Sequence, residues 1–125
     1  MRPLEGLFVL DFSTLLPGPL ATLLLAEAGA EVVKIEPPGR GEEMRGHAPK
    51  WGHDSVSFAL LNRGKRSVAL DLKNVARSRL GPLVKRADVI VEQFRPGVMK
   101  RLGLDYESVA KLNPRVVYCS ISGYG

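Results

Sequence analysis

Five short apolar stretches punctuate the chain, and segments of helical or irregular character separate them. They are expected at Leu7–Asp11, Glu31–Glu36, Ser67–Leu72, Ala87–Glu92 and Arg115–Ser122. Runs this short, several of them rich in β-branched residues, are typical of strands that are buried on both faces. Their spacing leaves room for a right-handed crossover between successive strands. The sequence therefore predicts an α/β fold, a Rossmann-like open and mainly parallel sheet with flanking helices.

Helices are expected between these strands. The predicted helical segments are Leu20–Ala28, Asp54–Leu61, Asn74–Arg86, Val98–Leu102 and Tyr106–Leu112. Asp54 and Asp105 stand at the starts of two of them and are expected to act as caps. Gly81-Pro82 lies inside the third segment, and a break or kink is expected there because proline removes a backbone donor. Residues 39–54 have no periodicity and predict a long loop, which in a compact domain is often functional.

Length and charge narrow the class of protein. The 125 residues, 45% of them hydrophobic, suffice for one compact domain. A net charge of +5 suits an anionic partner, which could be nucleic acid, a membrane surface or a phosphorylated small molecule. Aromatic residues amount to 6% and no basic stripe follows a helix, so nucleic acid is not expected. No apolar run approaches the roughly 20 residues of a membrane span, and a soluble, cytoplasmic protein is expected.

Residues that bind metals or act as nucleophiles are scarce. Cys119 is the single cysteine and lies in a predicted strand, where a buried structural thiol is expected. His47 and His53 are the two histidines, and their spacing matches no metal motif, so no metal site is expected. The first strand is not followed by Gly-x-Gly-x-x-Gly, and the chain has neither a Gly-Lys-Ser/Thr phosphate loop nor a Gly-x-Ser-x-Gly elbow. Common nucleotide-binding and hydrolase motifs are thus missing.

Basic residues concentrate in or beside the connecting segments. They are Arg40, Arg45, Lys65, Arg66, Lys73, Arg95, Lys100 and Arg101. Such side chains at strand ends can hold phosphates, although each could equally solvate its loop. Asp11 and Asp71 are candidate acid or base groups, but capping a loop or pairing with a cation is the expected role. Trp51 and Phe94 could stack on an adenine ring or simply pack.

Ordered motifs along the whole chain resemble the class III coenzyme A (CoA) transferase family, also called CaiB/BaiF, which includes formyl-CoA transferase and alpha-methylacyl-CoA racemase. The matching segments are Pro3–Gly6 leading into Val9–Asp11, Pro17–Pro19, Gly29–Gly39, Asn62–Ser67, Leu70–Lys73, Ala87–Val89, Phe94–Met99, Leu102–Leu104, Asn113–Arg115 and Ser120–Gly123. Each motif is weak alone. Their shared order makes a chance resemblance improbable.

The resemblance implies a Rossmann-like larger domain, a second smaller domain and a homodimer of two chains interlinked like rings. Members move CoA between carboxylic acids through acyl-CoA thioesters, by way of a nucleophilic aspartate. The racemase branch instead uses a histidine and a carboxyl group as acid and base. Both sets would lie beyond Gly125. Residues 1–125 are thus expected to be the N-terminal part of the CoA-binding domain, without the rest of that domain or the small domain, and to be inactive alone.

The family's CoA contacts, in contrast, would fall within this chain. By resemblance they involve Leu16, Pro17, Leu70, Asp71, Leu72, Lys73, Gln93, Phe94, Arg95 and Arg101. Lys73, Arg95 and Arg101 would face phosphates. Pro37 stands where some members have arginine, so Arg40 is expected to supply that contact. CoA or an acyl-CoA would be a substrate, with no permanently bound cofactor.

Two alternatives to the transferase remain open at this point. One is a segment of an acyl-CoA racemase, since Leu16–Pro19 and Glu92–Arg95 also resemble that branch. The other is a CoA-binding or structural subunit without activity. An incomplete sheet would also expose apolar surface and a strand edge, and self-association is then expected.

Overall fold

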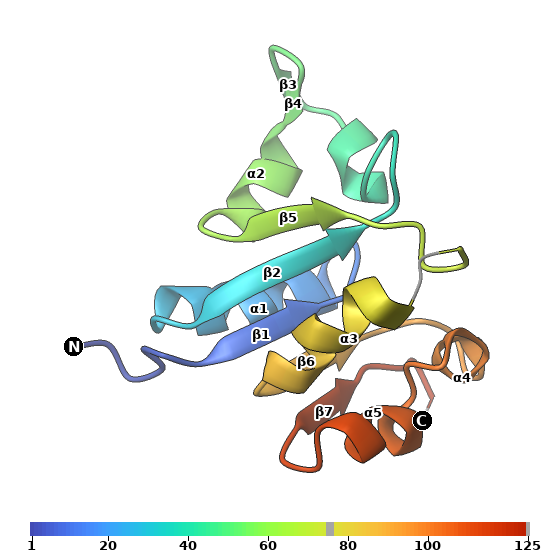
Figure 1. Ribbon diagram of the computed structural model, residues 1–125. Helices are drawn as coiled ribbons and strands as arrows, with labels where there is room; N and C mark the ends of the chain where they lie inside the picture. The colour runs from blue at the N-terminus through green and yellow to red at the C-terminus, as the bar shows by residue number, and fades with distance from the viewer. Residues whose placement is uncertain (75–76, 125) are drawn as a thin grey trace.

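A five-stranded parallel sheet forms the centre of the computed structural model, which describes residues 1–74 and 77–124 (Figure 1). Its strands are β1 (Phe8–Asp11), β2 (Glu31–Glu36), β5 (Arg66–Ala69), β6 (Val89–Glu92) and β7 (Val117–Ser120). They lie side by side in the order β5-β2-β1-β6-β7, and each neighbouring pair is parallel. The predicted fold class is therefore confirmed, and the second strand has the predicted bounds.

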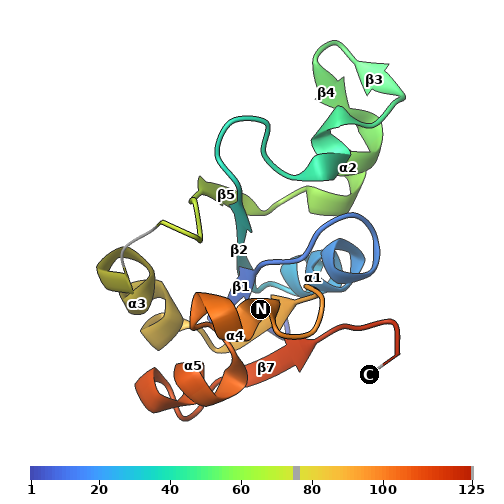
Figure 2. The ribbon, with the colours of Figure 1, turned by 90° about the vertical axis from the view of Figure 1, so that its right-hand side faces the viewer.

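Helices cover both faces of this sheet (Figure 2). The helices α1 (Pro17–Glu27) and α2 (Val56–Asn62) lie on one side, and α3 (Arg77–Arg86), α4 (Val98–Leu102) and α5 (Tyr106–Leu112) lie on the other. Side chains alternate along each strand, so β1 sends Phe8 and Leu10 into the core beneath α3 and α5. Val9 points the opposite way and packs with Val32 and Val91 on the side of α1.

The predicted long loop has structure of its own. It contains a 3₁₀ turn, η1 (Glu43–Gly46), and an antiparallel hairpin formed by β3 (Lys50–Trp51) and β4 (Asp54–Ser55). The prediction that Asp54 caps α2 was wrong, because Asp54 pairs with Trp51 in the hairpin. Ser55 is the cap instead, and its Oγ accepts a hydrogen bond from the Phe58 amide at 3.3 Å. Asp105 occupies the predicted cap position of α5, but its carboxylate accepts no hydrogen bond from the first turn of the helix.

A break at Gly81-Pro82, one of the two predicted outcomes, does not occur. Helix α3 runs from Arg77 to Arg86 with Pro82 inside it. Leu80 and Val84, on either side of the proline, are buried in the core, and their burial compensates for the backbone hydrogen bond that Pro82 cannot form. The predicted start of this helix at Asn74 leads into residues 75–76, which lie outside the described residues.

Cys119 is exposed, so the expectation of a buried thiol was wrong. The reason is its place on β7, an edge strand that has a helix on one face only. Tyr118 packs toward α5, and its neighbours Val117 and Cys119 point to the uncovered face, where Val117 is 62% exposed. Among the described helices, none has the length and apolar character to cross a bilayer.

Candidate functional site

The sheet reverses its winding direction between β1 and β6. The chain leaves β1 toward α1 on one side and leaves β6 toward α4 and α5 on the other (Figure 2). Counted in chain order, the strands are arranged 3-2-1-4-5, as in doubly wound nucleotide-binding sheets. In such sheets the ligand crevice lies beyond the carboxyl ends of the two strands at the reversal. The ends of β1 and β6 therefore mark the first place to look for a site.

A cavity of about 610 Å³ opens at this point. It is lined by Pro17 from the start of α1, by residues 93–96 after β6 and by residues 121–124 after β7. Pro17 and the segment Gln93–Arg95, predicted separately as ligand-binding residues, are thus brought together by the fold. Phe94 is half-buried and Arg95 is exposed. The lining of the cavity therefore includes the aromatic ring of Phe94 and the exposed cation of Arg95.

Gln93 ties the two sides of the cavity together. Its Nε2 donates to the Thr14 carbonyl at 2.6 Å, and its Oε1 accepts from the Gly18 amide at 3.0 Å. Both ends of the carboxamide are thus engaged with the chain that joins β1 to α1. A Cβ atom on Gly18 would lie 2.5 Å from Gln93 Oε1 and closer still to the Ser13 side chain. This position accordingly requires glycine.

Asp11 anchors the same loop from below. Its carboxylate accepts hydrogen bonds from the Ser13 amide at 2.8 Å and from Thr22 Oγ1 at 2.5 Å. It also pairs with Lys65 Nζ at 3.2 Å, so the expected pairing role of Asp11 is confirmed. Burial lowers the pKa of Lys65 to about 8, against the opposing effect of the Asp11 carboxylate. Lys65 also donates to the Pro19 carbonyl at 2.9 Å and thereby holds the first turn of α1.

The second predicted group, Leu70–Lys73, follows β5. The Asp71 carboxylate accepts from Asn74 Nδ2 at 2.7 Å and from the Lys73 amide at 3.2 Å. The bond from Asn74, followed by that from the Lys73 amide, lowers the pKa of Asp71. The structure thus confirms the expected capping role of Asp71. Lys73 itself is exposed.

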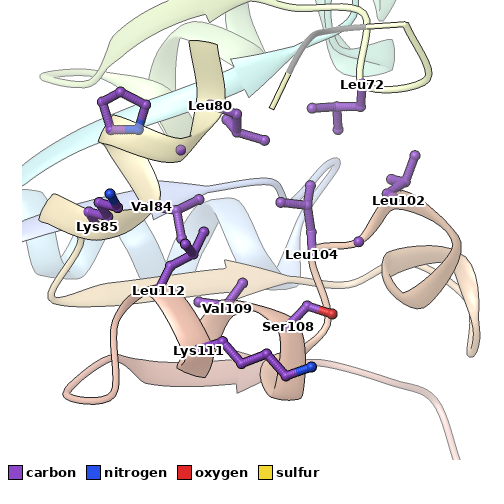
Figure 3. Close-up of a pocket in the computed structure, with 13 residues that line it drawn as sticks. Leu72, Leu80, Val84, Lys85, Leu102, Leu104, Ser108, Val109, Lys111 and Leu112 are labelled. Carbon is purple, nitrogen blue, oxygen red and sulfur yellow. The ribbon is translucent and has the colours of Figure 1, made fainter. Parts of the chain in front are cut away.

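Leu72 opens onto a largely apolar groove of about 590 Å³ between α3 and α5 (Figure 3). Leu102 of α4 lies at the same end of the groove as Leu72. Arg101 precedes Leu102 on α4 and is exposed. The fold therefore brings the segment after β5 near the helix that carries Arg101.

Arg40 lies in a third place. It lines a hollow of about 220 Å³ together with Glu36 and Arg45, and it is exposed. Trp51 is on the hairpin of β3 and β4, which Figure 1 places beyond β5 and so at the far side of the sheet from β7. Of the predicted basic residues, Arg40, Lys73 and Arg95 follow the carboxyl ends of β2, β5 and β6, whereas Lys65 and Arg66 stand at the amino end of β5. Arg40 and Arg95 line separate hollows.

Comparison with known proteins identifies the family. The sequence pattern of the family described as CoA-transferase family III matches residues 4–125. This chain belongs to that family. It is 48% identical to acetyl-CoA:oxalate CoA-transferase of Acetobacter aceti over 98% of its length, and 42% identical to succinyl-CoA:glutarate CoA-transferase of Mus musculus over 100%. The crystal structure of a CaiB/BaiF family protein from Brucella suis superposes with a TM-score of 0.92, at 38% identity over 99% of the chain.

The family III chain is short compared with these relatives. It spans 32% of the Acetobacter protein, 29% of the mouse protein and 34% of the Brucella chain. Its resemblance in fold to the Brucella structure nevertheless covers nearly every residue. The comparison thus supports the CoA-transferase family III fold for these residues.

The sequence did not predict the buried charged residues that contact the loop between β1 and α1 in this family III chain. Lys34 and Glu42 form an ion pair at 3.1 Å, with both side chains 1% exposed. Glu36 is also buried and accepts from Arg45 Nε at 2.6 Å. One signal was present, because Lys34 stands in the middle of the apolar strand Val-Val-Lys-Ile and a buried lysine needs a partner. The identity of that partner, in an aperiodic segment, was not readable.

Proposed function

We propose that this chain is the N-terminal, CoA-binding part of a CoA-transferase that moves CoA between carboxylic acids through acyl-CoA thioesters. The observation that carries the proposal is the meeting of Pro17 with Gln93–Arg95 at the winding reversal, in a chain of CoA-transferase family III. The relatives named above are transferases that act with oxalate or glutarate, and this favours a transferase over a racemase. The catalytic aspartate would come from a segment after Gly125, so this chain alone would bind CoA without turnover.

Unpaired cations support phosphate binding at the carboxyl edge. Arg40, Lys73, Arg95 and Arg101 are all exposed, and within residues 1–74 and 77–124 none of them takes part in an ion pair. Guanidinium and ammonium groups of this kind form charge-assisted hydrogen bonds with phosphate oxygens. Lys73, Arg95 and Arg101 would contact the phosphates, with Arg40 a further phosphate contact. Phe94 and Leu72 would provide apolar contacts to the adenine or pantetheine part.

Calorimetry with CoA on the unaltered chain tests this function. We expect weak binding, with a Kd on the order of 0.1–1 mM, because the cations that would contact the phosphates are exposed to solvent. Arg95→Ala is expected to weaken binding about tenfold by removing one charge-assisted contact. Arg115→Ala is the matched control. Arg115 is also exposed, but it precedes β7 and so lies at the amino ends of the strands, away from the proposed site. No heat of binding at millimolar CoA would contradict the proposed function.

We further propose that the protein is cytoplasmic and works as a homodimer. Helix α1 supports pairing, because Leu20 and Leu24 lie one turn apart and are 43% and 60% exposed. The exposed thiol of Cys119 suits a reducing compartment. Sedimentation at several concentrations tests the dimer: Leu24→Glu should shift the chain toward monomer, whereas Leu112→Glu on the other side of the sheet should not. Equal association of both variants would argue against α1 as the interface.

A further inference from the structure

The loop between β1 and α1 is held by side chains from distant parts of the chain. Lys34 Nζ of β2 donates to the Ser13 carbonyl at 3.0 Å. Glu42 Oε1, from the segment after β2, accepts from the Leu15 amide at 3.1 Å. Gln93 bonds to Thr14 and Gly18, as described above. The backbone leading to Leu16 and Pro17 is thus fixed on several sides.

Leu15 is in a conformation that leucine rarely adopts. Its φ is 61°, in the left-handed region that favours glycine, and it is the one described non-glycine residue with a positive φ. A strained backbone of this kind persists when the surrounding structure holds it in place. The bond from the Leu15 amide to Glu42 is such a restraint. It acts one residue before Leu16, the first of the predicted CoA contacts.

Lys34 and Glu42 also hold each other. Their ion pair is 3.1 Å long and both side chains are 1% exposed. Glu42 Oε2 accepts from the Met44 amide at 2.6 Å, and the Glu42 amide donates to Glu36 Oε1 at 2.8 Å. A buried ion pair is often no more stabilising than an apolar pair of the same size. The bonds of this pair to the Ser13 carbonyl and the Leu15 amide suit a role in fixing the conformation of the loop.

We propose that the Lys34–Glu42 pair positions the loop Ser13–Pro17 for CoA, by holding Leu15 in its left-handed conformation. Both side chains are 1% exposed and would not reach the ligand, so both are positioning residues. The inference rests on the proposed CoA-binding function and extends it. It also links that site to residues 37–55. Glu42 belongs to this segment, so the conformation of the segment would affect the conformation of the loop.

The test combines amide hydrogen exchange with CoA titration of the whole chain. In Glu42→Gln the Leu15 amide should exchange at least about tenfold faster, while Leu10 in β1 stays protected. The Kd for CoA should rise about tenfold, since the competent loop conformation becomes less populated. Glu43→Gln is the matched control: Glu43 is the adjacent, exposed carboxylate, and the same change there should alter neither quantity.

A second variant separates positioning from stability. Lys34→Met/Glu42→Leu removes both charges and keeps the volume, so its melting temperature should stay within roughly 5 °C of the unaltered chain. Its Leu15 amide should nevertheless exchange fast, and its CoA affinity should stay low. Unchanged Leu15 exchange in this variant, or equal acceleration at Leu15 and Leu10 in both variants, would overturn the inference.

The two proposals can fail separately. Fast Leu15 exchange with an unchanged Kd for CoA would refute the link to the ligand and leave CoA binding intact. If the unaltered chain bound no CoA, the proposed function would fall, and the positioning of the loop would still be decided by the exchange at Leu15.

Discussion

Gly18 shows how one residue determines the shape of the site. A side chain there would overlap Ser13 and press on Gln93 Oε1. Gly18→Ala is therefore expected to lower the free energy of unfolding by about 1–3 kcal/mol, as overpacking does. Urea unfolding measures this loss. Gly46→Ala is the control, because Gly46 is exposed and a Cβ there meets nothing within 4 Å. Equal stability of both variants would show that the packing around Gly18 is loose.

Glu36 makes the free energy of unfolding depend on pH in the acid range. Burial raises the pKa of its carboxyl, but hydrogen bonds from Arg45, Ser67 and the Glu42 amide outweigh burial and lower the pKa to about 2 from 4.5. A pKa below its unfolded value contributes stability that is present above pH 4.5 and is lost as the pH falls from about 4.5 to about 2. The contribution at neutral pH is about 2–3 kcal/mol.

Urea unfolding between pH 7 and pH 3 tests this contribution. Glu36→Gln cannot ionise, so its free energy of unfolding should fall less steeply with acid than that of the unaltered chain. Parallel pH profiles for the two proteins would mean that another carboxyl carries the acid sensitivity.

Single residues also show where sequence prediction succeeds. Asp11 and Asp71 are predicted from the sequence to cap a loop or pair with a cation, and both do so. The partners of Lys34 and Glu36 could not be predicted. The partners in their ion pairs are Glu42 and Arg45, whose placement depends on a 3₁₀ turn without periodicity.

At the scale of elements, α3 is a helix that forms although it contains a proline, Pro82. Pro82 removes the bond that its amide would donate to the carbonyl four residues earlier. Pro82→Ala should restore that bond and raise the free energy of unfolding by about 1–3 kcal/mol. Pro38→Ala, in the turn after β2, is the control and should bring no gain. A Pro82→Ala variant no more stable than the unaltered chain would indicate that α3 depends on the proline.

Elements differed in how well they could be predicted. The inner strands were recognisable because burial on both faces favours continuous apolar runs, as in Leu7–Leu10. The hairpin of β3 and β4 was missed, since each strand has two residues and they are mostly exposed. Packing of Leu80 and Val84 overrode the local signal at Pro82, which no reading of local propensity includes.

At the scale of the whole molecule, the parallel sheet places four of the predicted ligand segments after the carboxyl ends of its strands. Leu16 and Pro17 follow β1, Arg40 follows β2, residues 70–73 follow β5 and residues 93–95 follow β6. The segments after β1 and β6 are neighbours, because these two strands lie side by side in the sheet. The spacing of the apolar runs alone does not predict this strand order. The ends of β1 and β6 are therefore the part of the sheet where we expect CoA to bind.

Nuclear magnetic resonance titration of the isotope-labelled chain with CoA tests that claim most directly. We expect progressive amide shifts at Leu16 and at residues 93–95, with smaller shifts at residues 70–73. Amides at the amino ends of the strands, such as that of Val117, should not move. Saturable shifts confined to the groove between α3 and α5, or no shifts at millimolar CoA, would contradict it.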